Sequence, residues 1–108
     1  MKSTMTPQEI RRALLLRQEL AIVDLREEAI FALAHPLFAA QIPLASLAAE
    51  MPLRVPRLAT QIVVYDEGEG LVEPALELLR QMGYSNVSYL DGGLARYGIR
   101  GLPGRQFL

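Results

Sequence analysis

Three short apolar runs, each closed by an aspartate, limit the folds open to this chain more than any other feature of its sequence. They read LAIVD at residues 20–24, IVVYD at 62–66 and VSYLD at 87–91. Continuous apolar runs of this length are typical of strands that are buried on both faces of a sheet. Helical patterns separate the runs, so the sequence predicts an α/β fold whose mainly parallel sheet is covered by helices on both faces.

The segments between the runs carry the signals of helix starts. Thr6 is predicted to cap a helix in which Pro7 takes the first position and Glu9 completes a capping box. An apolar stripe predicts another helix over residues 71–82, with Pro74 in its first turn, where a missing N–H is harmless. These two segments are the clearest helices that the sequence offers.

The middle of the chain is predicted to be less regular. A helical pattern over residues 26–35 should end at Pro36, and QIPLA at 41–45 is compatible with a short strand. Ser46 is predicted to cap one or two helical turns, after which Pro52 begins an irregular stretch. No repeat and no internal linker interrupts the chain, so residues 1–108 are expected to form a single domain.

Composition excludes several classes of function. The chain is 51% apolar, which is enough for a core at this length, and its 11 basic and 12 acidic residues give a net charge of −1. That balance provides no attraction to nucleic acid or to an acidic membrane surface. No apolar run approaches the roughly 18 residues of a membrane span, and the N-terminus lacks the apolar core of a signal peptide. A cytoplasmic location is therefore expected.

The chain contains no cysteine and one histidine, His35. Disulfides, thiolate metal sites and cysteine nucleophiles are therefore excluded. One imidazole without sulfur ligands is also a poor basis for a zinc site. We accordingly predict neither a metal nor another cofactor.

The aspartates that close the three runs lie where α/β proteins bind ligands, at the carboxyl ends of the strands. Asp24 and Asp91 are predicted to be turn residues or helix caps, which is the commonest use of aspartate at such positions. Phosphoacceptor chemistry at Asp24 or Asp66 is disfavoured, because the one lysine of the chain, Lys2, lies at its start.

Two segments resemble the signatures of rhodanese-like domains. The first, VDLREEAIFALAHPLFAAQIP, has the Asp-x-Arg-Glu, the His and the later Ile-Pro of that family, and the second, MGYSNVSYLDGGL, has its Gly-aromatic turn, strand and Asp-Gly-Gly. The resemblance covers about Thr6 to Gly101 and implies a three-layer α/β/α fold with a mainly parallel central sheet of about five strands. The signature residues are Asp24, Arg26, Glu27, His35, Asp91, Gly92 and Gly93.

The chain departs from this family at its most important position. Rhodanese-like enzymes carry a nucleophilic cysteine at the start of a six-residue loop that also contains an arginine. Here the loop reads Asp66, Glu67, Gly68, Glu69, Gly70 and Leu71. Asp66 has no sulfur and cannot form a persulfide, and the loop carboxylates repel a dianion such as thiosulfate. The resemblance therefore implies a degenerate loop without a catalytic residue, and a rhodanese-like phosphatase is excluded on the same grounds.

The loop suggests one structural hypothesis. Its backbone N–H groups should point inward at the start of the following helix, and the Asp66 carboxylate is placed to accept them in the role of a bound anion. Glu67 and Glu69 are predicted to be solvated acids rather than cation ligands. Arg26 and Glu27 are predicted to have a structural role, by pairing or capping near the edge of the sheet, and His35 to be a packed or hydrogen-bonded turn residue.

Three functions follow from this reading. The first is a non-catalytic rhodanese-like module with a structural, regulatory or partner-binding role. The alternative is part of a multidomain sulfurtransferase whose cysteine lies in another domain. A third is a free-standing module that meets a basic partner through its acidic loop. The expected partners are other rhodanese domains of the same chain or another protein.

Overall fold

A computed structural model of the chain describes residues 4–26, 34–36, 39–68, 70–90 and 105–107. Its centre is a five-stranded sheet in the order β1-β6-β5-β2-β4, and every neighbouring pair is parallel. The strands are β1 (Thr4–Met5), β2 (Leu20–Asp24), β4 (Ala39–Gln41), β5 (Gln61–Tyr65) and β6 (Val87–Leu90). The helices are α1 (Pro7–Leu15), α3 (Leu47–Arg54), preceded by a 3₁₀ turn at Leu44–Ser46, and α4 (Val72–Gln81). A separate pair of short parallel strands joins β3 (Ala34–Pro36) to β7 (Arg105–Phe107).

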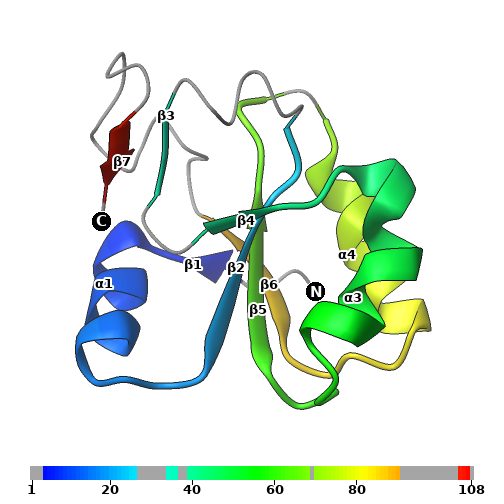
Figure 1. Cartoon of the computed structure of the whole chain (residues 1–108), viewed down its shortest axis with the longest axis horizontal. Helices are drawn as coiled ribbons and strands as arrows, with labels where there is room; N and C mark the ends of the chain where they lie inside the picture. Colours follow the sequence, from blue (N-terminus) through cyan, green and yellow to red (C-terminus); the bar gives the residue numbers. More distant parts are fainter. Residues whose placement is uncertain (1–3, 27–33, 37–38, 69, 91–104, 108) are drawn as a thin grey trace.

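Two apolar cores hold the helices against opposite faces of the sheet (Figure 1). On one face, Ile10 of α1 packs with Ile22 and Val63. On the other face, the buried side chains of α3 and α4 pack against the alternate residues of the same strands, such as Val23 and Val64. Successive side chains of a strand point to opposite faces, so strands covered on both sides read as continuous apolar runs. The predicted three-layer α/β/α fold is confirmed.

The predicted start of α1 is confirmed in its details. The Thr6 hydroxyl accepts the backbone N–H of Glu9 at 3.1 Å, and the Glu9 carboxylate accepts the backbone N–H of Thr6 at 2.8 Å. This reciprocal pair satisfies two donors that a helix leaves open at its first turn. The helix that was predicted over residues 71–82 is confirmed as α4, with Pro74 in its first turn.

The end of α1 contains a left-handed residue that is not glycine. Arg17 has φ 57°, and the N–H of Gln18 closes the helix by donating to the carbonyl of Ala13 at 2.9 Å. A side chain in this conformation costs about 1–2 kcal/mol, and glycine avoids most of that cost. We expect Arg17→Gly to raise the free energy of unfolding by about 0.5–1 kcal/mol once the greater chain entropy of glycine is included.

Urea denaturation measures this change, with Arg12→Gly as the matched control. Arg12 is exposed within the same helix, where glycine should lower the free energy of unfolding by about 1 kcal/mol. If both glycine variants are destabilised equally, the left-handed strain at Arg17 does not contribute to stability.

Three local predictions for the middle of the chain are wrong. Pro52 does not end a helix, because α3 continues to Arg54 and is held by the fully buried Leu47 and Met51. This apolar packing outweighs the one backbone hydrogen bond that a proline removes. Ser46 precedes α3 but makes no capping hydrogen bond through its side chain, and the short strand lies at Ala39–Gln41 rather than at 41–45.

His35 also differs from its prediction as a turn residue at the end of a helix. It lies in β3, opposite Gln106 of β7. Gln106 lies 71 positions after His35 in the sequence. A local pattern cannot reveal a strand whose pairing comes from so far away. Residues 27–33, the rest of the predicted helix, lie outside the described residues.

Candidate functional site

The loop that follows β5 lies at the carboxyl end of the sheet and leads into α4 (Figure 1). Its first residue, Asp66, is only 6% exposed. One oxygen of its carboxylate accepts the N–H of Gly68 at 3.0 Å and the other accepts the N–H of Leu71 at 2.8 Å. Gly68 has φ +99° and Gly70 has φ +84°, conformations that L side chains rarely adopt. The two glycines allow the loop to curl around its own carboxylate, as the sequence hypothesis predicts.

This arrangement assigns the Asp66 carboxylate the role of an internal ligand. Inward-facing N–H groups at the start of a helix form a natural anion site, and a carboxylate there is stabilised by the helix dipole. Both oxygens of Asp66 are engaged by loop amides. The chain itself therefore supplies the anion for the two amides of Gly68 and Leu71.

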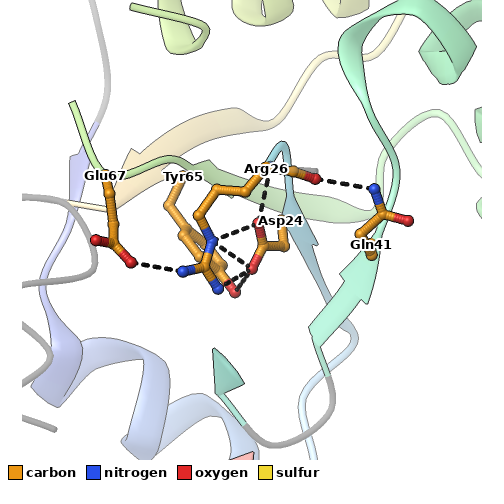
Figure 2. A network of polar contacts seen from close by, with 5 residues as sticks. All are labelled: Asp24, Arg26, Gln41, Tyr65 and Glu67. Atoms are coloured by element: carbon orange, nitrogen blue, oxygen red, sulfur yellow. Dashed lines mark hydrogen bonds and ion pairs between the residues drawn. The ribbon is translucent and has the colours of Figure 1, made fainter. Parts of the chain in front are cut away.

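A second set of polar contacts lies beside the loop, at the ends of β2 and β5 (Figure 2). Asp24 is fully buried and Arg26 is 2% exposed. The Arg26 guanidinium donates from Nε to Oδ1 of Asp24 at 2.9 Å and from Nη2 to Oδ2 at 2.6 Å. The backbone N–H of Arg26 donates to the same carboxylate at 2.9 Å. A forked guanidinium–carboxylate contact of this kind is among the strongest hydrogen-bonded pairs in proteins.

Tyr65 completes the pairing between the two strands. Its hydroxyl donates to Oδ2 of Asp24 at 2.6 Å, and the Arg26 guanidinium carbon lies 5.8 Å from the centre of its ring. Burial lowers the pKa of the Arg26 guanidinium, but its hydrogen bond and charge interaction with Asp24 outweigh this effect and raise the pKa overall. Arg26 therefore stays charged inside the protein and neutralises Asp24.

Glu67 ties the loop to this buried pair. Its carboxylate accepts from Nη1 of Arg26 at 2.5 Å, and its side chain is 50% exposed. Figure 2 shows the guanidinium between Asp24 and Glu67. The two neighbours of Asp66 in the sequence are therefore both held at the end of β2. Tyr65 bonds to Asp24, and Glu67 bonds to Arg26. Asp66 itself accepts hydrogen bonds from residues that follow it in the loop.

Comparison with known proteins identifies the architecture. Residues 6–99 match the profile of the rhodanese-like domain. The chain belongs to the rhodanese-like domain family. Comparison with curated proteins finds no match to this chain.

Solved structures agree with this family. A thiosulfate sulfurtransferase from Pseudomonas aeruginosa is 53% identical with a TM-score of 0.87, and the match covers 89% of this chain but only 18% of that one. The Alr3790 protein from Anabaena sp. is 25% identical with a TM-score of 0.80, over 96% of this chain and 82% of that one. An NMR structure of the rhodanese-like domain of Alr3790 is 25% identical with a TM-score of 0.79, over 99% and 81%.

In a rhodanese-like enzyme the loop after the central strand begins with the nucleophilic cysteine, and here that position is Asp66. Because the chain has no cysteine at all, no other residue can take over the same role. Among the described residues, Arg26 pairs with the carboxylates of Asp24 and Glu67, while the carboxylate of Asp66 is held by loop amides, so these four side chains together carry a negative formal charge. In the described part of the site, the carboxylates hold the loop amides and Arg26 in place, and the chain has no thiol from which a persulfide could form.

The predictions made for the rhodanese signature residues have different outcomes. The structural role predicted for Arg26 agrees with the structure, although its partners are Asp24 and Glu67. The prediction that Asp24 is a turn residue or cap accounts only for the bond from the Arg26 N–H, because the carboxylate is chiefly a buried ion-pair partner. Glu67 is paired rather than simply solvated. The remaining signature and loop residues lie outside what the structure describes or have no described side chain: Glu27, His35, Glu69, Asp91, Gly92 and Gly93.

Sequence reasoning did not predict the roles of Tyr65 and Gln41. Tyr65 belongs to one of the predicted strands, and its apolar neighbours in the sequence give no sign of a buried hydroxyl contact. Gln41 donates from Nε2 to the backbone carbonyl of Arg26 at 2.9 Å. The sequence pattern placed Gln41 at the start of a short strand rather than at its end, so it contained no signal for this contact.

Within the described ranges, no three His, Asp or Glu side chains lie close enough together to hold a metal ion. None of the helices in the described part of the chain has the length and apolarity needed to cross a membrane.

The rhodanese fold of this chain should lose stability at alkaline pH through Tyr65. Burial, followed by the charge of Asp24, raises the pKa of the Tyr65 phenol above its ordinary value of about 10. The protonated phenol therefore contributes its full stability below pH about 10 and loses it as the pH rises toward the higher folded-state pKa. We expect the free energy of unfolding of the wild type to fall more steeply above pH 10 than that of Tyr65→Phe. Chemical denaturation at a series of alkaline pH values measures both slopes, and equal slopes would exclude this role for Tyr65.

Proposed function

We propose that this chain is a non-catalytic rhodanese-like module of a longer sulfurtransferase whose nucleophilic cysteine lies in another domain. Its role there is structural or regulatory, through contact with the other domains. The observation that carries the proposal is Asp66, which occupies the position of the nucleophile and is bonded at both oxygens to amides of its own loop.

The chemistry of the loop supports the non-catalytic part of the proposal. Sulfur transfer from thiosulfate requires a thiolate that attacks the outer sulfur, forms a persulfide and releases sulfite. A carboxylate cannot form that bond. The negative loop also opposes the approach of a dianion, because like charges in a partly buried site repel each other strongly. The loop therefore lacks two separate requirements of the reaction, namely the nucleophile and the electrostatic attraction for the substrate.

The comparison with the Pseudomonas aeruginosa thiosulfate sulfurtransferase supports the multidomain part. The match at 53% identity covers 18% of the length of that enzyme, so a region like this chain is a small part of a much longer protein there. A domain without a nucleophile is compatible with sulfur transfer by such a protein when another domain provides the cysteine.

Restoring the sulfur alone should not restore the reaction. We expect Asp66→Cys to form thiocyanate from thiosulfate and cyanide at or close to the rate of the buffer blank, because Glu67 remains beside the new thiol and holds Arg26. Thiocyanate is measured by its coloured iron complex, and a thiol-reactive disulfide reagent verifies that the new thiol is reduced and accessible. The double variant Asp66→Cys/Glu67→Gln is the matched comparison and should exceed the single variant. Robust, saturable turnover by Asp66→Cys alone would show that the negative charge does not block the reaction.

The multidomain proposal has its own test in the mass of the native gene product. An immunoblot of the extract from its own cell, with an antibody against this domain, gives that mass directly. A product several times heavier than the 12.0 kDa of this chain supports the proposal. A product of about 12.0 kDa contradicts it and leaves a free-standing, non-catalytic module as the function.

A further inference from the structure

A polar groove lies on the α1 side of the sheet, beside the amino end of β5. It has a volume of about 390 Å³ and is lined by residues of β1, α1, the connection from α1 to β2 and the start of β5. Figure 1 shows α1, β1 and this connection to the left of β5. Small-molecule sites in proteins usually have volumes of about 300–1,000 Å³, so the groove is large enough for a small ligand. Its polar lining residues are Thr4, Glu9, Arg12, Gln18 and Gln61.

The groove is distinct from the loop that begins with Asp66. Gln61 is the first residue of β5 and Tyr65 is the last, so the groove and the loop lie at opposite ends of this strand. None of the described residues of the loop lines the groove. A function of the groove is therefore independent of the missing nucleophile.

Several polar side chains of the lining have hydrogen-bonding capacity that the described part of the chain leaves unused. Among the described residues, the Arg12 guanidinium has no ion-pair or hydrogen-bond partner, although it offers five N–H donors. The Gln18 carboxamide has no such partner there either. The Gln61 carboxamide donates at 3.1 Å to the sulfur of Met5, and a thioether is a weak acceptor. The groove thus presents donors and acceptors that are available to a ligand.

The charges of the described lining residues are one positive and one negative, both on α1. Glu9 and Arg12 are three positions apart, which makes them neighbours on a helix, yet they form no ion pair with each other. Oε1 of Glu9 accepts the backbone N–H of Thr6 at 2.8 Å, which holds the carboxylate at the start of the helix. Neither of the neighbouring cations, Arg11 and Arg17, lines the groove.

This distribution of charge indicates the class of ligand. A simple anion in the groove would be repelled by Glu9, and a simple cation would be repelled by Arg12. A ligand that carries both charges is attracted to both residues. The remaining polar groups of the described lining are uncharged, and each of the two carboxamides can both donate and accept a hydrogen bond. They match an uncharged polar group on the same ligand.

We propose that the groove binds a free α-amino acid with an uncharged polar side chain. The ligand carboxylate accepts from the Arg12 guanidinium, whose forked donors match a carboxylate. The ligand ammonium group donates to Glu9, whose second oxygen is not used by the helix cap. The ligand side chain bonds to the carboxamides of Gln18 and Gln61. These contacts make the groove a ligand site separate from the degenerate loop.

Nuclear magnetic resonance of the ¹⁵N-labelled 108-residue chain tests this proposal, with L-glutamine as the probe at concentrations up to about 50 mM. We expect saturable shifts of the backbone amides of Gln18 and Gln61, and none at Gly68 in the loop. The dissociation constant should be on the order of 1 mM, as for a ligand of about ten heavy atoms in an open groove. The absence of saturable shifts at the groove up to about 50 mM would overturn the proposal.

Truncated probes test which groups of the ligand are recognised. Glutaramate lacks the ammonium group of glutamine, and 4-aminobutanamide lacks its carboxylate. Each should bind about tenfold more weakly than L-glutamine or worse, because one charged contact is lost. L-Leucine keeps both charges without the carboxamide and should bind several-fold more weakly. If either truncated probe binds as tightly as L-glutamine, the groove does not recognise a zwitterion, and equal binding of L-leucine would exclude the contact with the side chain.

Two arginine variants test the protein side of the same contacts. Arg12→Met should weaken binding of L-glutamine by about tenfold or more. Arg17→Met is the matched control, because it removes an exposed positive charge that lies outside the groove, and it should leave binding unchanged. Binding to Arg12→Met that equals binding to the wild type would overturn the proposal.

Glu9→Gln separates ligand recognition from the stability of α1. The glutamine carbonyl can still accept the N–H of Thr6, so the helix cap is kept while the negative charge is lost. In this variant the ammonium group should no longer add affinity, so glutaramate should bind about as tightly as L-glutamine. If L-glutamine keeps its full tenfold advantage over glutaramate in Glu9→Gln, the proposed contact with Glu9 is wrong.

Discussion

Replacing Arg26 with methionine should lower the free energy of unfolding by about 3–5 kcal/mol, which is a large part of the stability of a domain of this size. The reason is the Asp24 carboxylate, which is fully buried and receives the forked guanidinium of Arg26. Removing the guanidinium leaves a buried negative charge without its compensating partner, and the Tyr65 hydroxyl alone cannot balance it. The same substitution also releases Glu67, so the entry to the loop loses one of its two attachments to β2.

Urea denaturation compares this variant with Arg54→Met, which removes an exposed ion pair with Glu50 and should cost less than about 1 kcal/mol. If Arg26→Met does not fold, Arg26→Lys gives a measurable alternative, since it keeps the positive charge and loses the paired hydrogen bonds of the guanidinium. The double variant Asp24→Asn/Arg26→Met should recover part of the loss, because it removes the buried charge together with its partner. Equal small losses for Arg26→Met and Arg54→Met would mean that the buried pair does not support the fold.

Asp66→Ala has the second largest expected effect, a loss of about 2–3 kcal/mol in the free energy of unfolding. The substitution removes the shared acceptor of two loop amides, those of Gly68 and Leu71, and also a negative charge near the start of α4. Asp66→Asn is the matched control. Its amide oxygen can accept from one of the two N–H groups but not from both, so its loss should be about half as large.

Amide hydrogen exchange locates the effect of Asp66→Ala within the loop. The amides of Gly68 and Leu71 should exchange much faster in the alanine variant, while amides in the centre of β5 should change only with global stability. Unchanged exchange at both amides would show that the carboxylate does not hold the loop.

The predictability of this fold from sequence differs between its parts, for physical reasons. The three Asp-ended runs and the Thr6–Glu9 capping box have local signals, and the structure confirms them. The continuation of α3 through Pro52 depends on the burial of Leu47 and Met51 against other elements, which no local pattern contains. The pairing of His35 with β7 depends on a strand near the other end of the chain.

In the candidate site too, features that depend on local sequence could be predicted and features that depend on distant residues could not. The internal-ligand role of Asp66 could be predicted because the acid and the amides that it accepts are neighbours in one loop, with glycines at the positions that need positive φ. The contacts of Tyr65 with Asp24 and of Glu67 with Arg26 each join residues that are 41 positions apart along the chain. Only the parallel register, in which Asp24 lies opposite Tyr65, brings them together.

We infer that the loop of this rhodanese-like domain is a structural element without sulfur-transfer activity. The most direct measurement is the rate of thiocyanate formation from thiosulfate and cyanide by the unmodified 108-residue chain. We expect a rate equal to that of the buffer blank at every protein concentration. Thiocyanate formation that increases with protein concentration and saturates with thiosulfate would contradict it, because a carboxylate at position 66 would then support a reaction for which it has no chemical means.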